Sequence, residues 1–315
     1  MTTMEQTVQP IPKTRSHLWD KFLQNPITVK ELRSRMRGRR GFVVLTTYLL
    51  LMVGFITLVY LIYSAAANSP TGPNSRQAGK VVFTAVLAIE TFLVVFIGPA
   101  FTMAAISSEK ERQTYDLLRT TLLSARSFVL GKLLSALSYV FLLIIVAIPI
   151  QSIAFLLGGV SPIEVVLSQF LVFLSAVTFA LIGLFFSSLM RTTLAASVGT
   201  FSIAALLIAA APVLAFVFLM FSGPFLFGIY SPSWTVQAFL IYGGLLQAAT
   251  KFPATLILSE VFLLERNALF IFPEVIDGHT IYLFSPWFVY SALYIVLALL
   301  LYWGTVRRVR RIADR

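Results

Sequence analysis

The sequence predicts an all-α integral membrane protein with a six-helix transmembrane bundle. Of its 315 residues, 58% are hydrophobic and only 12% are charged, and the mean hydropathy is +0.88. Soluble domains carry about 25% charged residues, so this chain has too few charges to cover a water-facing surface. Six apolar runs are long enough to cross a hydrocarbon core of about 30 Å, which takes about 20 helical residues. These runs lack the alternating pattern of membrane β-strands, and this favours helices.

The positions of the apolar runs define the expected organisation of the chain. We predict an N-terminal cytoplasmic tail with an interfacial helix over residues 1–41, followed by a single transmembrane domain over residues 42–315. The six spans are expected at about residues 42–63, 81–106, 128–157, 165–190, 194–221 and 287–306.

The positive charges predict the orientation of these spans. Most of the 24 Lys and Arg residues lie before the first span, after the second span, between the fourth and fifth spans or after the last span; the exceptions are Arg76, Lys80, Lys251 and Arg266. Because basic loops are retained on the cytoplasmic side, both termini are expected there, in a multi-pass protein of the cytoplasmic (plasma) membrane. The net charge of +11 is then an orientation signal, and we expect no binding of nucleic acid.

An amphipathic helix is predicted before the first span. Asn25 and Pro26 suit the cap and the first turn of a helix. Val29, Leu32 and Met36 recur on one side of it, and basic residues spread over the rest. Such a helix lies in the membrane interface. Two functions remain open for it, an elbow that transmits motion to the first span and a basic anchor.

The loop over residues 107–127 carries the most polar sequence between two spans. Ser107 or Ser108 can cap a short helix, with Glu109 and Glu111 in its first turn, where the helix dipole favours acidic residues. Apolar side chains follow at helical spacing, at Tyr115, Leu118 and Leu122. A solvated loop would not need this apolar face, so the segment predicts docking onto a soluble partner. The alternative is an interfacial helix that contacts only lipid.

Two segments of the sequence resemble ABC-2-type transporter permeases. The motifs that carry the resemblance are Asn25-Pro26 with Lys30-Glu31-Leu32-Arg33, and Glu109-Lys110-Glu111-Arg112 with Thr114 and Leu117-Leu118, ending at Leu123-Ser124 and Gly131-Lys132. In that family an amphipathic helix precedes six spans, and the charged loop after the second span contacts the ATPase subunit. The chain departs from the family pattern at Gln113, where Gly is usual, and at Leu122, where Pro is common.

The resemblance implies a permease subunit that moves a substrate and is driven by ATP hydrolysis in a separate subunit. Export is expected because the family mostly exports. The implied partners are two copies of an ABC ATPase subunit, a second permease copy that is identical or related, and membrane lipids. By the same analogy, the residues that couple the chain to the ATPase are Glu109, Glu111, Thr114, Asp116, Leu117 and Leu118, supported by Glu31 and Arg33 of the elbow helix.

The sequence carries no sign of an enzyme site. Its Gly-Lys pairs, at Gly79 and Gly131, lack the other residues of a phosphate-binding loop, so ATP and Mg are expected to bind only in the partner ATPase. The chain has no cysteine and only two histidines, His17 and His279, which are expected on opposite faces of the membrane. We therefore expect no catalytic residues, no metal site and no cofactor in this chain.

The stretch over residues 222–286 is too apolar for an ordinary outer loop. Two further spans at 234–249 and 252–272 would give eight in total. The alternative, which the resembled family favours, is a re-entrant helical hairpin that dips into the outer leaflet and breaks at Phe252-Pro253. Irregular backbone at membrane depth must be covered by protein or line a cavity, so the hairpin is a candidate outer gate.

Glu90 is an acidic residue deep inside a predicted span. An ionised carboxylate there costs about 2.5 kcal/mol or more, so it should face the bundle interior, water or a partner, or be protonated. Glu90 therefore remains open as a possible intramembrane site for a proton or cation, or as a hydrogen-bonded acid that holds helices together. The two rival functions are an ion-coupled secondary transporter that uses Glu90 and a non-transporting membrane scaffold.

Overall fold

The structure is a computed structural model that describes residues 39–67, 75–113, 124–157, 160–226, 233–249, 270–276 and 278–313. The predicted elbow helix lies outside these residues.

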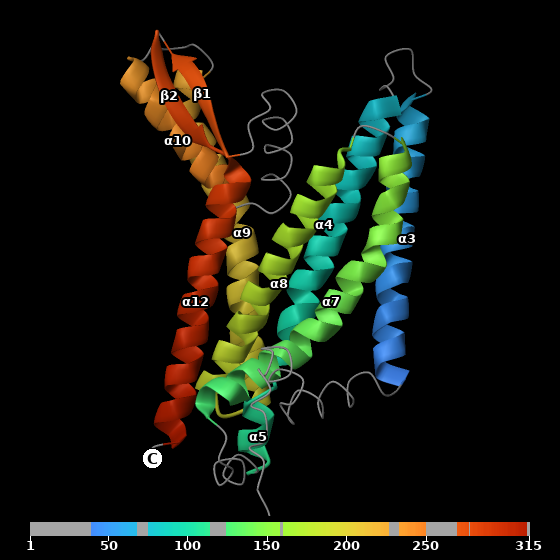
Figure 1. Ribbon diagram of the computed structural model, residues 1–315, viewed down its shortest axis with the longest axis vertical. Helices are drawn as coiled ribbons and strands as arrows, with labels where there is room; N and C mark the ends of the chain where they lie inside the picture. The colour runs from blue at the N-terminus through green and yellow to red at the C-terminus, as the bar shows by residue number, and fades with distance from the viewer. Residues whose placement is uncertain are drawn as a thin grey trace, which may run out of the picture.

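Within this part of the chain, six helices are long and apolar enough to cross a membrane. They run side by side as an all-helical bundle (Figure 1). This arrangement confirms the fold class that the sequence predicts. The six helices are α3 (Arg39–Ala67), α4 (Ser75–Thr102), α7 (Ala125–Leu157), α8 (Pro162–Leu189), α9 (Thr193–Leu226) and α12 (Pro286–Ala313).

Helix α8 forms the centre of the bundle. It packs against α4, α7, α9 and α12, and 72% of its most apolar window is buried. Its first turn is fixed by a capping box. The Glu164 backbone N–H donates to Ser161 Oγ at 3.3 Å, and the Ser161 backbone N–H donates to Glu164 Oε2 at 3.0 Å.

The crossing of α4 and α8 is close because a glycine stands at the contact. A Cβ atom at Gly183 would lie 2.3 Å from Thr102 Oγ1 and 3.0 Å from the Pro99 carbonyl oxygen. Small residues allow helices to approach each other closely in membranes, where packing replaces the hydrophobic effect as the driving force. The backbone of α4 therefore rests directly on α8 at this level.

Helices α3 and α9 form the outside of the bundle. Only 11% and 6% of their apolar windows are buried, and large side chains such as Phe42, Leu50, Phe216 and Phe221 are exposed. A surface of this kind would aggregate in water, but it suits contact with lipid chains. The lipid therefore takes the place of an outer layer of protein.

A small cap lies at one end of the bundle, which we call the hairpin end (Figure 1). It contains the 16-residue helix α10 (Trp234–Ala249) and an antiparallel pair of strands, β1 (Ile271–Ile276) and β2 (His279–Phe284). Gly278 takes a φ of +78° in the tight turn between the strands, a conformation that glycine adopts without strain. The Tyr242 hydroxyl donates to the Tyr282 carbonyl at 2.5 Å, which ties α10 to β2.

From the sequence we expect only helices over residues 222–286, and the strand pair differs from this expectation. Residues 271–276 form a short run rich in apolar and β-branched side chains, which fits a strand better than a helix turn. Helix α10 coincides with the first of the two additional spans considered above. Its 16 residues rise about 24 Å, less than a hydrocarbon core of about 30 Å, so it gives no support to an eight-span topology. Whether this region re-enters the membrane stays a prediction.

The Gly183 contact predicts a difference between two glycine substitutions. We expect Gly183→Ala to lower the melting temperature of the purified protein, because the added methyl group forces α4 and α8 apart at a cost of about 1–3 kcal/mol. Gly98→Ala is the matched control on the facing helix, since its Cβ would meet the Ala176 carbonyl oxygen at an ordinary 3.5 Å. Equal melting temperatures for the two variants would contradict the close crossing.

Candidate functional site

The loop between α4 and α7 builds the candidate site at the end of the bundle opposite the hairpin. After Thr102 the chain makes a turn and enters the short helix α5 (Ser107–Glu111). We call this end of the bundle the α5 end (Figure 1).

The start of α5 is held by a serine from another helix. The backbone N–H groups of Ile106 and Ser107 both donate to Ser187 Oγ of α8, at 2.9 and 3.0 Å. The expectation that Ser107 or Ser108 caps this helix is wrong, because their hydroxyls instead donate to the carbonyls of Met103 and Ala104 in the preceding turn. Hydroxyl groups often bond to backbone carbonyls four residues earlier, and here this leaves the cap to Ser187.

Glu109 and Lys110 of α5 bind two different helices. Glu109 Oε1 forms a salt bridge of 2.6 Å with Lys132 Nζ of α7. Lys110 Nζ donates to the carbonyls that end α8, at 2.6 Å to Ser188 and 3.2 Å to Met190. A cation at a helix C-terminus satisfies free carbonyl groups and interacts favourably with the helix dipole.

Glu111 extends the same pattern to a third helix. Its Oε1 accepts a hydrogen bond of 3.1 Å from the backbone N–H of Thr193, the first residue of α9. A carboxylate at a helix N-terminus matches the positive end of the dipole. Three consecutive residues of α5 therefore hold the helix to α7, to the end of α8 and to the start of α9.

The pair of Glu109 and Lys132 is largely removed from solvent. Their side chains are 19% and 9% exposed, and Lys132 Nζ also lies 5.7 Å from the centre of the Phe128 ring. Removing one charge of such a pair leaves the other buried without its partner, which is strongly unfavourable. This contact fixes the distance between α5 and α7.

Gln113 ends the described part of this loop in an unusual backbone conformation. Its φ is +56°, in the left-handed region that glycine adopts most readily after the end of a helix. This is the position at which the sequence analysis notes glutamine in place of the usual glycine. The structure therefore requires a left-handed residue there, and glutamine accepts it with some strain.

The predicted coupling residues divide into two groups. Glu109 and Glu111 bind helices of this chain. Thr114, Asp116, Leu117 and Leu118 lie outside the described residues, as do Glu31 and Arg33 of the elbow. Sequence reasoning did not assign roles to Lys110, Ser187 and Lys132. Lys110 and Lys132 belong to the motifs quoted above, whereas Ser187 carries no local signal because it lies 80 residues from Ser107.

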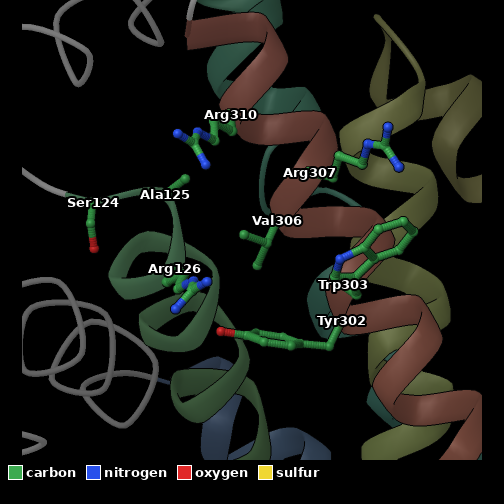
Figure 2. A pocket seen from close by; sticks show the side chains of 8 residues that line it. All are labelled: Ser124, Ala125, Arg126, Tyr302, Trp303, Val306, Arg307 and Arg310. Carbon is green, nitrogen blue, oxygen red and sulfur yellow. The ribbon is translucent and has the colours of Figure 1, made fainter.

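A basic cavity opens beside α5, between the start of α7 and the end of α12. Its volume is about 680 Å³. Figure 2 shows Arg126 and Arg310 facing the cavity from α7 and α12, with Arg307 lying near Trp303 on the other flank of α12. No acidic side chain lines the cavity within the described residues, and its lining residues are Ser124, Ala125, Arg126, Tyr302, Trp303, Val306, Arg307 and Arg310. The α5 end therefore carries a positive surface.

Glu90 lies inside the bundle, far from α5 along α4. Its side chain is completely buried, and it connects α4 to α7 and α8 through hydrogen bonds from Gln151 and Gln169. Among the described residues, no group of three or more His, Asp and Glu side chains is placed to hold a metal ion.

Comparison with known proteins finds one protein family whose model matches this chain. The family described as ABC-2 family transporter protein matches residues 26–252, which is more than half of the chain and includes α3 to α10. No curated protein matches the sequence.

The buried pair of α5 predicts non-additive effects of substitution. We expect Glu109→Gln and Lys132→Gln each to reduce the free energy of unfolding, by an amount near the lower end of about 3–5 kcal/mol, because each leaves one buried charge without its partner. The double variant should lose less than the sum, with a coupling energy of about 0.5–3 kcal/mol. Denaturant unfolding of the purified protein measures this. Additive losses would mean that the two side chains do not interact.

Proposed function

Because the chain belongs to the ABC-2 family of transporter proteins, we propose that it is the permease subunit of an ATP-driven exporter of the cytoplasmic membrane. The chain is a multi-pass membrane transport component, and membrane proteins of this family work with ATP-binding subunits. We further propose that two ABC ATPase subunits and a second permease copy complete the transporter. ATP and Mg bind in those ATPase subunits, and this chain supplies the path through the membrane.

The observation that carries the proposal is the attachment of α5 to three helices. A force applied to a flexible loop is absorbed by the loop, whereas a force applied to a fixed element moves whatever is fixed to it. The side chains of Glu109, Lys110 and Glu111 attach α5 to α7, α8 and α9. Motion of an ATPase against α5 would therefore move these helices as a group, in the manner of rigid-body switching.

We propose that residues of the loop over residues 107–127 have two different roles, attachment to this chain and contact with the ATPase. Glu109 and Glu111 act as anchors inside the chain. Contact with the ATPase then falls to the exposed Arg112 and Gln113 and to the residues that follow, including Asp116, Leu117 and Leu118. Leucines beside a charged turn suit an apolar groove on a soluble partner.

The charge at the α5 end supports the proposed orientation. Arginines line the cavity beside α5 and continue along the end of α12, at Arg307, Arg308, Arg310 and Arg311. Basic residues at span ends are retained on the cytoplasmic side. The α5 end would then face the cytoplasm, where ATP is available, and the hairpin end would face outward.

Two variants are expected to separate docking of the ATPase from transmission of its motion. Leu117→Asp with Leu118→Asp should abolish copurification of the ATPase, because charges replace the apolar contact. Lys110→Met should keep the ATPase bound but reduce ATP-driven substrate efflux from vesicles at least about tenfold, because the end of α8 loses a charge-assisted bond worth about 1.5–3 kcal/mol. The measurement combines copurification with transport.

Arg191→Gln is the matched control for the Lys110 variant, since it removes an exposed charge from the turn that follows the end of α8 and should leave transport driven by ATP nearly unchanged. Full ATPase binding by the variant with two aspartates, or full transport by Lys110→Met, would contradict the proposed division of the loop.

A further inference from the structure

A polar cluster lies among the apolar side chains of α3, α4, α7 and α8. We call it the Glu90 cluster, and it consists of Tyr48, Glu90, Gln151 and Gln169. Glu90 is 0% exposed, and Tyr48 and Gln151 are each 1% exposed. Tyr48 packs in the same cluster of buried side chains as Leu87 and Val94, which lie one turn before and one turn after Glu90 on α4. Each of four transmembrane helices therefore contributes one polar side chain to one buried place.

The hydrogen bonds of the Glu90 cluster are incomplete. Glu90 Oε2 accepts from Gln151 Nε2 at 2.5 Å and from Gln169 Nε2 at 3.2 Å. Within the described part of the chain, the other carboxylate oxygen of Glu90, the amide oxygens of both glutamines and the Tyr48 hydroxyl have no hydrogen-bond partner. Three of these four atoms only accept hydrogen bonds, and the hydroxyl donates a single one. The cluster therefore lacks donors.

The described residues also place no positive side chain in the cluster to balance the charge of a Glu90 carboxylate. Glu90 supplies the carboxylate of the cluster, and none of the Lys, Arg and His side chains that the structure describes belongs to it. Lys80 is ten residues away on α4, which is about 15 Å along the helix. Other titratable groups on the packed helices have their own contacts: Tyr139 with the Gly41 carbonyl, Lys132 with Glu109, and Glu164 with the Ser161 backbone.

A role as a hydrogen-bonded link between helices explains only one oxygen of Glu90. It leaves a negative charge inside the membrane, and each buried polar atom without a partner costs about 1–3 kcal/mol. An anion would add further hydrogen-bond acceptors and more negative charge. A positively charged occupant has the opposite effect, because it neutralises the carboxylate and binds oxygen atoms that have no donor.

We propose that the Glu90 cluster is a binding site for one hard positive charge, supplied by a proton or by an alkali metal ion. A proton on Glu90 Oε1 would turn an oxygen without a partner into a donor and remove the charge. An alkali metal ion would be bound by carboxylate, amide and phenol oxygens, which are ligands that hard cations prefer. A divalent ion fits less well, because it would leave a net positive charge inside the lipid.

The test uses the full-length chain purified in detergent, with Glu90→Gln as the variant and Glu164→Gln as the matched control. Glu164 is also a buried glutamate, on α8, but it belongs to the capping box. Infrared spectroscopy at pH 7 detects the carbonyl band of a protonated carboxylic acid. Melting temperatures in NaCl, KCl and choline chloride detect an alkali metal ion.

If a proton occupies the site, a carboxylic acid band appears in the wild type and in the control but not in Glu90→Gln. If an alkali metal ion occupies it, Na⁺ or K⁺ raises the melting temperature of the wild type and the control by about 5 °C relative to choline at one hundred times the dissociation constant. The same salts then leave Glu90→Gln unchanged.

Tyr48→Phe provides a milder variant in case Glu90→Gln does not fold, since it removes only a hydroxyl group. It should shift the frequency of the acid band or weaken the ion effect severalfold. A wild-type protein with no acid band at pH 7 and no response to either alkali metal ion would overturn the proposal without the use of any variant. The proposal does not depend on the ATPase, so its failure would leave the proposed exporter function untouched.

Discussion

The absence of water inside the bilayer is the constraint on which this structure depends. Backbone and side-chain polar groups in the hydrocarbon core must find partners within the protein, because lipid offers none. This requirement makes the apolar runs helical and places Glu90 among amides rather than among lipid chains. It also explains the many serine and threonine hydroxyls that donate to carbonyls of their own helices, as Ser175 and Thr200 do.

A different requirement acts at the α5 end, where the termini of α5, α8 and α9 meet and their backbone groups lack partners within their own helices. The end of α8 and the start of α9 expose backbone groups that need partners, and α5 supplies them with Lys110 and Glu111. In return, Ser187 of α8 accepts the first N–H groups of the α5 region. Helix termination and loop attachment are therefore one set of contacts. A transporter of this family gains from it a rigid element at the place where we propose that the ATPase binds.

Sequence reasoning works best here where one physical effect dominates. Lipid imposes long apolar runs, so the six helices are predictable from hydropathy alone, and the short helix after α4 is predictable from its acidic first turn. The partners of individual side chains are a different matter. Gln151 and Gln169 lie 61 and 79 residues from Glu90, so only the packing of the bundle brings them together. The Asp277-Gly278 pair and the β-branched residues before it are hairpin signals in the sequence, but the strongly apolar composition of the whole stretch over residues 222–286 leads to the expectation of helices.

If α5 transmits the motion of an ATPase, it must move as one body with the ends of α8 and α9. Spin labels at Arg112 and Arg191, both exposed, test it through the distance between them in the chain purified with its ATPase. We expect one narrow distance distribution that is the same without nucleotide and with ATP trapped in the complex. A distance that broadens or changes when ATP binds would show that α5 moves independently of these helices, and would contradict the account.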